Sequence, residues 1–214
     1  MAALVALLSL FAAICGALHV RAEYRGPRWQ TYVWKPLTTS LILAVALVAP
    51  GPVPPLYRAL IVAGLACSLA GDVFLMLPAD RFLPGLASFL IAHLLYIGAF
   101  TEAGGFQPSP AALLPFAVAV AALLRILWPQ LGGQRLPVTA YVLVIATMGW
   151  QALAQWIAVA EGWALCALLG AALFVVSDAA LATNRFRGAF ASAQLLVLGT
   201  YYPAQWLIAL SVMR

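Results

Sequence analysis

The stretch "RALIVAGLACSLAGDVFLML", residues 58–77, is small or apolar throughout, apart from Arg58 at its start, Ser68 and Asp72. About 20 helical residues, at ~1.5 Å each, cross the ~30 Å hydrocarbon core of a bilayer. A carboxylate is costly in such a helix, at about 2.5–3.5 kcal/mol for an Asp at the centre of a span. The stretch therefore predicts a membrane helix in which Asp72 has a specific role.

Similar apolar stretches recur along all 214 residues, of which 65% are hydrophobic and 8% charged, with a mean hydropathy of +1.03. This composition leaves too little polar surface for a soluble globule. The stretches lack the alternation of a membrane barrel, and a helix satisfies its own backbone in lipid. The sequence predicts a single all-α domain over residues 1–214, a bundle of eight transmembrane helices. The expected spans are 2–20, 30–49, 58–77, 84–103, 110–128, 135–156, 162–183 and 190–212.

The arginines predict the orientation of this integral membrane protein. Arg58 and Arg214 are on one side, whereas eight arginines lie in or beside the loops after the odd-numbered spans. By the positive-inside rule these loops face the cytoplasm and both termini face out, in what we expect to be a bacterial inner membrane. The net charge of +5 thus gives no reason to invoke nucleic acid. The eight are Arg21, Arg25, Arg28, Arg81, Arg125, Arg135, Arg185 and Arg187.

Two acids, Asp72 and Asp178, lie well inside predicted spans that run in the same direction. Each is about five residues from the cytoplasmic end of its span, so the two share a depth of some ~7–8 Å. The segments "GDVFLMLPADRF" and "SDAALATNRF" are alike, which predicts a parallel internal repeat of four plus four helices. In such a repeat the two aspartates face each other across a pseudo-twofold axis.

Further polar side chains are predicted at compatible depths, which indicates a cavity in the cytoplasmic half of the bundle. Arg185 is seven residues beyond Asp178 and on the same helix face. Three alternatives remain open: an aspartate in a structural ion pair with Lys35 or Arg185, a lysine that reaches the headgroups, and polar side chains that join helices. The other candidates are Lys35, His93, Tyr96, Tyr141, Gln194, Tyr201 and Gln205.

Five segments carry a resemblance: "KPLTTSLIL", "GDVFLML", "GLASFLIAHLLYI", "FVVSDAALATNRF" and "YYPAQWLI". In this order, over residues 32–210, they resemble the YhhN/TMEM86 family of eight-helix membrane proteins. The resemblance implies a lysoplasmalogenase, an ether hydrolase that cleaves the sn-1 vinyl ether bond of lysoplasmenylcholine or lysoplasmenylethanolamine. The products are a fatty aldehyde and glycerophosphocholine or glycerophosphoethanolamine. By position, the resemblance implies catalytic roles for Asp72 and Asp178 and binding roles for Lys35, His93, Tyr96, Tyr141, Tyr201 and Gln205.

Vinyl ether hydrolysis needs a proton donor and an anion that stabilises an oxocarbenium-like cation, and two carboxylates in a low-dielectric site supply both. We expect no metal and no cofactor, because the cysteines, Cys15, Cys67 and Cys166, lack metal-site spacing. The expected partners are a lysophospholipid substrate, for whose phosphate Lys35 and Arg185 are candidates, and membrane lipids; the oligomeric state is not predicted. The alternatives are a proton- or cation-coupled transporter of a small solute or lipid that uses the same aspartates, and a non-catalytic lipid-binding protein.

Overall fold

The computed structural model describes residues 1–213, which form eight long α-helices and no strand. The predicted all-α bundle of eight helices is therefore confirmed. Two 3₁₀ turns, Trp128–Gln130 and Gly132–Gln134, join the fifth helix to the sixth. The helices are α1 (Ala2–Arg25), α2 (Arg28–Val48), α3 (Pro55–Met76), α4 (Phe82–Thr101), α5 (Pro110–Leu127), α6 (Arg135–Val159), α7 (Gly162–Phe186) and α8 (Ala193–Leu210).

Two helix boundaries differ from the prediction in ways that affect the site. Helix α1 continues past the expected end at residue 20 to Arg25, so Glu23 belongs to the helix rather than to a loop. Helix α7 continues to Phe186 and therefore contains Arg185. In both cases the helix extends beyond its apolar stretch into the polar residues at the membrane surface, where hydropathy no longer marks its end.

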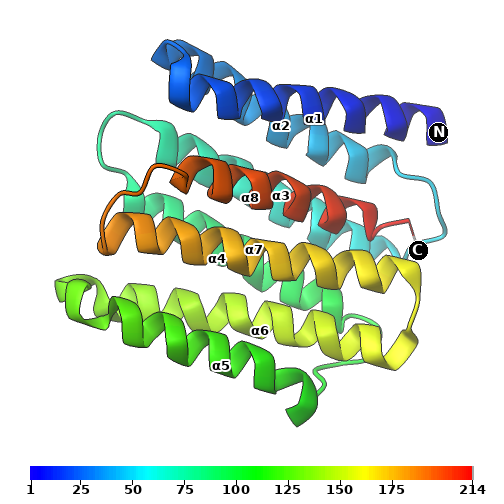
Figure 1. Ribbon diagram of the computed structural model, residues 1–214. Helices are drawn as coiled ribbons and strands as arrows, with labels where there is room; N and C mark the ends of the chain where they lie inside the picture. Colours follow the sequence, from blue (N-terminus) through cyan, green and yellow to red (C-terminus); the bar gives the residue numbers. More distant parts are fainter. Residues whose placement is uncertain (214) are drawn as a thin grey trace.

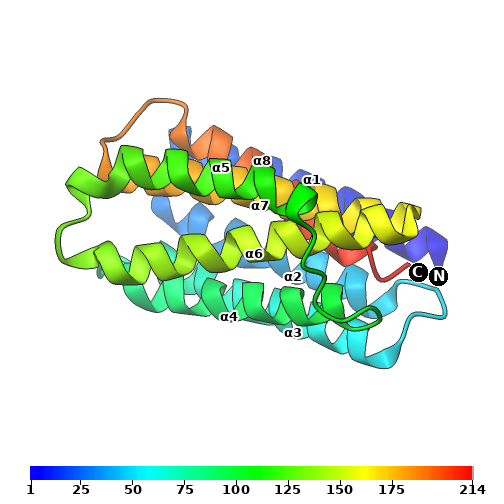
Figure 2. The same cartoon turned by 90° about the horizontal axis from the view of Figure 1, so that it is seen from below.

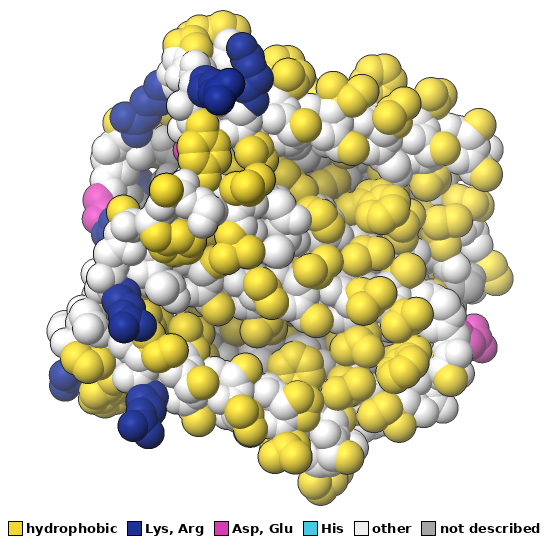
Figure 3. All heavy atoms as spheres, viewed as in Figure 1, with side chains coloured by type: hydrophobic (Ala, Val, Ile, Leu, Met, Phe, Trp, Pro, Cys, Tyr) yellow, Lys and Arg dark blue, Asp and Glu magenta, His cyan; other side chains and the backbone are white. Residues whose placement is uncertain are grey.

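The bundle has two layers of four helices (Figures 1 and 2). One layer holds α1, α8, α7 and α5 in that order, and the other holds α2, α3, α4 and α6. Both described chain ends lie at the same end of the bundle (Figure 1). Most of the Lys and Arg side chains visible in Figure 3 lie at the opposite end, where the loops after α1, α3, α5 and α7 meet.

The side of the bundle drawn in Figure 3 is covered with hydrophobic side chains. The most exposed apolar residues of α5 include Leu114 at 64% and Val118 at 60%. Seven of the described helices, α1 to α7, are long and apolar enough to cross a membrane. This chain is therefore an integral membrane protein. Helix α8 is not among these seven, so its crossing of the membrane stays a prediction.

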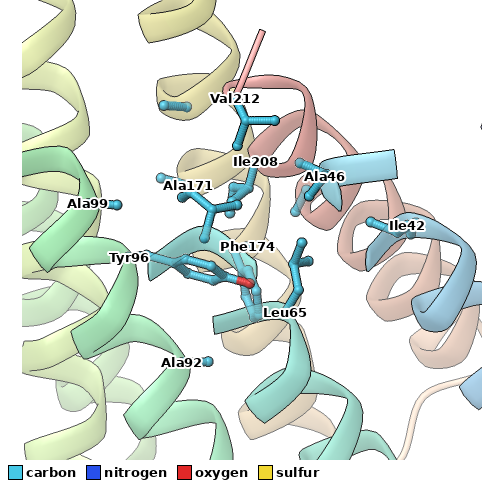
Figure 4. Close-up of a cluster of buried hydrophobic side chains, with 14 of the residues drawn as sticks. Ile42, Ala46, Leu65, Ala92, Tyr96, Ala99, Ala171, Phe174, Ile208 and Val212 are labelled. Atoms are coloured by element: carbon cyan, nitrogen blue, oxygen red, sulfur yellow. The ribbon is translucent and has the colours of Figure 1, made fainter. Parts of the chain in front are cut away.

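Small residues allow two helix pairs to pack closely. A Cβ atom on Gly71 of α3 would lie 2.6 Å from Phe89 Cε2 of α4, and one on Gly170 of α7 would lie 2.8 Å from the Ala204 carbonyl oxygen of α8. Such small residues are how membrane helices approach each other. Figure 4 shows the core between these pairs, where Tyr96 of α4 and Phe174 of α7 are buried. The predicted internal repeat is not confirmed by this packing and stays a prediction.

Candidate functional site

Asp72, on α3, is the most extensively bonded acid of the bundle interior, with a residue exposure of 1%. Its Oδ2 accepts hydrogen bonds from Thr39 Oγ1 at 2.6 Å and from Tyr201 Oη at 2.8 Å. Lys35 Nζ lies 3.4 Å from Oδ1 and forms an ion pair with it. These donors come from α2 and α8, so the carboxylate joins three helices, and an ammonium ion with two hydroxyls suits an ionised carboxylate.

Behind this carboxylate, a chain of hydrogen bonds continues into the core. Tyr201 accepts from Gln205 Nε2 at 3.2 Å, and Gln205 Oε1 accepts from Tyr96 Oη at 2.8 Å. Gln205 and Tyr96 have no exposed surface. They therefore fix the hydroxyl of Tyr201, and through it Asp72, rather than line an open space.

Asp178, on α7, has a different environment, because its Oδ2 accepts a hydrogen bond from the Tyr141 hydroxyl of α6. The ring of His93 packs edge-on against Tyr141 and Phe174, with centroids 5.3 and 4.6 Å apart. Within residues 1–213, neither nitrogen of this fully buried His93 has a hydrogen-bond partner. Asp178 thus has a neutral donor where Asp72 has a cation.

Both aspartates line one polar cavity of about 590 Å³ at the arginine-rich end of the bundle. Its walls come from the last turns of α1, α3 and α7 and the first turns of α2, α4 and α8. The predicted residues that line it are Lys35, Asp72, Asp178, Arg185, Gln194 and Tyr201. His93, Tyr96, Tyr141 and Gln205 are not among its lining residues, and their binding roles stay predictions.

A narrow apolar slot adjoins the polar cavity. It has a free volume of about 80 Å³ and runs between α4, α5, α6 and α7. The slot and the cavity share five residues in their walls: Leu75, Phe82, Phe89, Asp178 and Leu181. Side chains such as Ala119 of α5 and Ala182 of α7 line the slot. Asp178 therefore stands where a polar space meets an apolar one.

A second apolar groove, between α1, α2 and α8, is lined by Ala13, Gly16, Tyr202 and Trp206 among others. Neither aspartate lines it. The two apolar spaces therefore differ in whether they reach a carboxylate.

Arg185 was predicted on the helix face of Asp178, with an ion pair between them as one alternative, but its Nη2 donates to Asp80 Oδ2 at 2.5 Å. The guanidinium also lies over the ring of Phe82, 5.0 Å from its centroid. Two hydrogen bonds, the stronger influence from Arg185 and the weaker from the Phe82 backbone N–H, hold the pKa of the Asp80 carboxyl below its usual value. The pair joins the α3–α4 loop to the end of α7 at the rim of the cavity.

His19, Glu23 and Thr31, which line the cavity, are among the residues that were not predicted as site residues. Thr39, which donates to Asp72, was not predicted as a site residue either. Thr31, Lys35 and Thr39 share one face of α2 at intervals of four residues, a spacing that the sequence already displays. Among residues 1–213, no three His, Cys, Asp or Glu side chains gather in the manner of metal ligands.

Residues 30–212 match the model of the YhhN family. This chain belongs to the YhhN family. The Escherichia coli O157:H7 protein named "Uncharacterized membrane protein YhhN" is 34% identical over 207 residues, which cover 94% of this chain and 97% of that protein. Human "Lysoplasmalogenase TMEM86B" is 41% identical over 160 residues, 74% of this chain and 65% of that protein.

The bovine protein named "Lysoplasmalogenase TMEM86A" is 36% identical over 157 residues, 71% of this chain and 64% of that protein. No solved structure matches the chain. The residues matched to the YhhN family include all of those that line the polar cavity, except His19 and Glu23 of α1.

In this YhhN-family chain, replacement of Lys35 by Met is expected to lower the free energy of unfolding by on the order of 3 kcal/mol, because Asp72 loses the cation that compensates its buried charge. The double variant Lys35→Met/Asp72→Asn is expected to recover most of the loss. Thermal unfolding in detergent measures both. A double variant whose loss of unfolding free energy equals the sum of the two single losses would contradict the pairing. Arg185→Met, at an exposed ion pair, is the control.

Proposed function

We propose that this chain is a membrane-embedded lysoplasmalogenase that cleaves the sn-1 vinyl ether bond of lysoplasmenylcholine or lysoplasmenylethanolamine. The observation that carries the proposal is the position of Asp178, which lines both the polar cavity and the apolar slot, with Asp72 in the same cavity. The relatives named lysoplasmalogenase, at 36% and 41% identity, support it.

A lysoplasmalogen is polar on one side of its vinyl ether and apolar on the other. With the headgroup in the polar cavity and the first methylenes of the alkenyl chain in the slot, the vinyl ether lies at their junction beside Asp178. The ether oxygen then faces the cavity and the β-carbon of the double bond faces the slot. The shape of the site thus matches the division of the molecule at the bond to be cleaved.

The environments of the two aspartates suggest different roles. Asp72, with Lys35 and two hydroxyl donors, is held as an anion. Asp178 has the neutral hydroxyl of Tyr141 on Oδ2, which leaves Oδ1 to carry a proton toward the apolar slot. We assign Asp178 as the acid and Asp72 as the anion, the division of labour that two carboxylates have around an oxocarbenium ion in glycosidases.

The reaction then proceeds in three steps. The Asp178 proton adds to the β-carbon with the electrons of the double bond, and the resulting oxocarbenium ion is stabilised by the Asp72 carboxylate. Water adds to the adjacent carbon and gives its proton to the Asp178 carboxylate, which restores the acid and forms a hemiacetal. The hemiacetal C–O bond to glycerol breaks as the hydroxyl proton passes to the glycerol oxygen, which releases a fatty aldehyde and the glycerophospho product.

The direct test is aldehyde release from alkenyl lysophosphatidylcholine and lysophosphatidylethanolamine by the purified protein in detergent. Asp72→Asn and Asp178→Asn are each expected to lower kcat by roughly 10²-fold to 10⁴-fold, the usual contribution of a positioned acid or base. Glu161→Gln, at the opposite end of the bundle, is the matched control and is expected to keep wild-type activity. Full activity in both folded Asp variants would overturn the proposal, as would a folded wild type that releases no aldehyde.

The location of the substrate's alkenyl chain has its own test. Ala182→Phe narrows the slot, and we expect it to raise KM for a long-chain substrate roughly tenfold, equivalent to two displaced methylenes, with little effect on a short-chain analogue. Ala13→Phe makes the same change in the second apolar groove and is expected to leave both values unchanged. A raised KM in Ala13→Phe instead of Ala182→Phe would mean that the alkenyl chain lies between α1 and α8.

The orientation inferred from the arginines puts this cavity at the cytoplasmic leaflet of the inner membrane. A C-terminal alkaline phosphatase, which is active outside the cytoplasm, is therefore expected to be active, and a green fluorescent protein fused at the same place is expected to be dark. The opposite pair of results would reverse the orientation.

A further inference from the structure

Glu23, in the last turns of α1, has a carboxylate fixed at the wall of the polar cavity. Its Oε1 accepts hydrogen bonds from Thr31 Oγ1 at 3.0 Å and from His19 Nε2 at 3.2 Å. Because a carboxylate can only accept, His19 carries its proton on Nε2, and Nδ1 lies 2.7 Å from the Tyr202 hydroxyl. The Glu23 side chain is 23% exposed, so it is held in place and still faces the cavity.

One face of α2 sets the order of charges in this cavity. Thr39 donates to Asp72, Lys35 pairs with Asp72, and Thr31, one turn further toward the helix start, donates to Glu23. Four helical residues rise ~6 Å, so Glu23 is about one turn from the Lys35 position. From the interior toward the end of the bundle, the sequence of groups is a carboxylate, an ammonium ion and a second carboxylate.

This order is complementary to a lysophospholipid with an amine in its headgroup. From the sn-1 linkage outward, such a lipid presents the bond to be cleaved, an anionic phosphate and, two carbons further, a cationic nitrogen. With the linkage at the aspartates, the phosphate lies beside Lys35 and the ammonium group beside Glu23. We propose that Glu23, positioned by His19 and Thr31, is the binding site for the ammonium group of a zwitterionic headgroup.

The other acids of the cavity do not offer a free negative charge. Asp80 is paired with Arg185 and Asp72 with Lys35, and Asp178 is assigned as the protonated acid. Within residues 1–213, Glu23 has hydrogen bonds from a hydroxyl and an imidazole but no ion pair with Lys or Arg. Its charge is therefore available for a ligand cation.

The chemistry also sets a preference between headgroups. A primary ammonium donates hydrogen bonds to a carboxylate, whereas the quaternary ammonium of choline has no N–H to donate. Ethanolamine is therefore the preferred headgroup of this site. Placement of the linkage rests on the proposed function, but binding of the amine does not require any bond to be cleaved.

The test uses saturated 1-O-alkyl lysophospholipids, which lack the vinyl ether and stay intact. Affinities of the full-length protein in detergent are measured for the ethanolamine, choline and glycerol headgroups at one chain length. The wild type is expected to bind the ethanolamine lipid roughly tenfold more tightly than the glycerol lipid, the usual effect of a hydrogen bond to a charged group. Glu23→Gln is expected to abolish this ratio, and Glu161→Gln to preserve it.

Equal affinity of the wild type for the ethanolamine and glycerol lipids would overturn the amine site, and so would a ratio that survives in Glu23→Gln. If Glu23→Gln does not fold, Thr31→Val, which frees Glu23 from its α2 anchor, replaces it and is expected to reduce the ratio. Aldehyde release is measured separately with alkenyl lipids. Its absence in the wild type would overturn the proposed reaction, whereas the binding ratio would still decide the amine site.

Discussion

The carboxylate of Asp72 has to be satisfied inside a bundle that lies in hydrocarbon, and the site is arranged around that requirement. An uncompensated charge at this depth is costly, so Lys35 and Thr39 of α2 and Tyr201 of α8 converge on it. These contacts hold α2, α3 and α8 together at one end of the bundle. The polar cavity lies where this cluster faces Asp178 of α7.

The same constraint explains why the two aspartates differ. Asp72 is bonded on both oxygens by groups that favour its charged form, whereas Asp178 has the Tyr141 hydroxyl on one oxygen and an apolar slot beside it. In the proposed reaction, these different neighbours make one acid the anion and the other the proton donor. The ring of His93 packs edge-on against the ring of Tyr141, so the donor to Asp178 is itself held in place by packing.

Much of this arrangement could be predicted from the sequence, because hydropathy sets the spans and a buried carboxylate marks a site. The depth shared by Asp72 and Asp178 predicted a common cavity, which the structure shows. Depth alone did not distinguish residues that line the cavity from residues behind its wall, so Tyr96 and Gln205 were grouped with Tyr201. That distinction depends on the rotation of each helix, which packing decides.

Glu23 and His19 were missed for a different reason. The expected first helix ended with its apolar residues, which placed Glu23 in a loop and separated it from His19. In the structure the two are one turn apart on α1, bonded to each other. Arg185 was predicted on the same helix face as Asp178, but the α3–α4 loop brings Asp80 to it, and loop positions are not set by helical periodicity.

The central claim is that Asp72 and Asp178 act as one catalytic unit in a shared cavity. The most direct test is to compare the kcat/KM for aldehyde release of the double variant Asp72→Asn/Asp178→Asn with that of each single variant. Groups that act as a unit have strongly non-additive effects, so we expect the double variant to keep about the same residual rate as the less active single variant. A double variant whose loss equals the product of the two single losses would show that the carboxylates act independently and would contradict it.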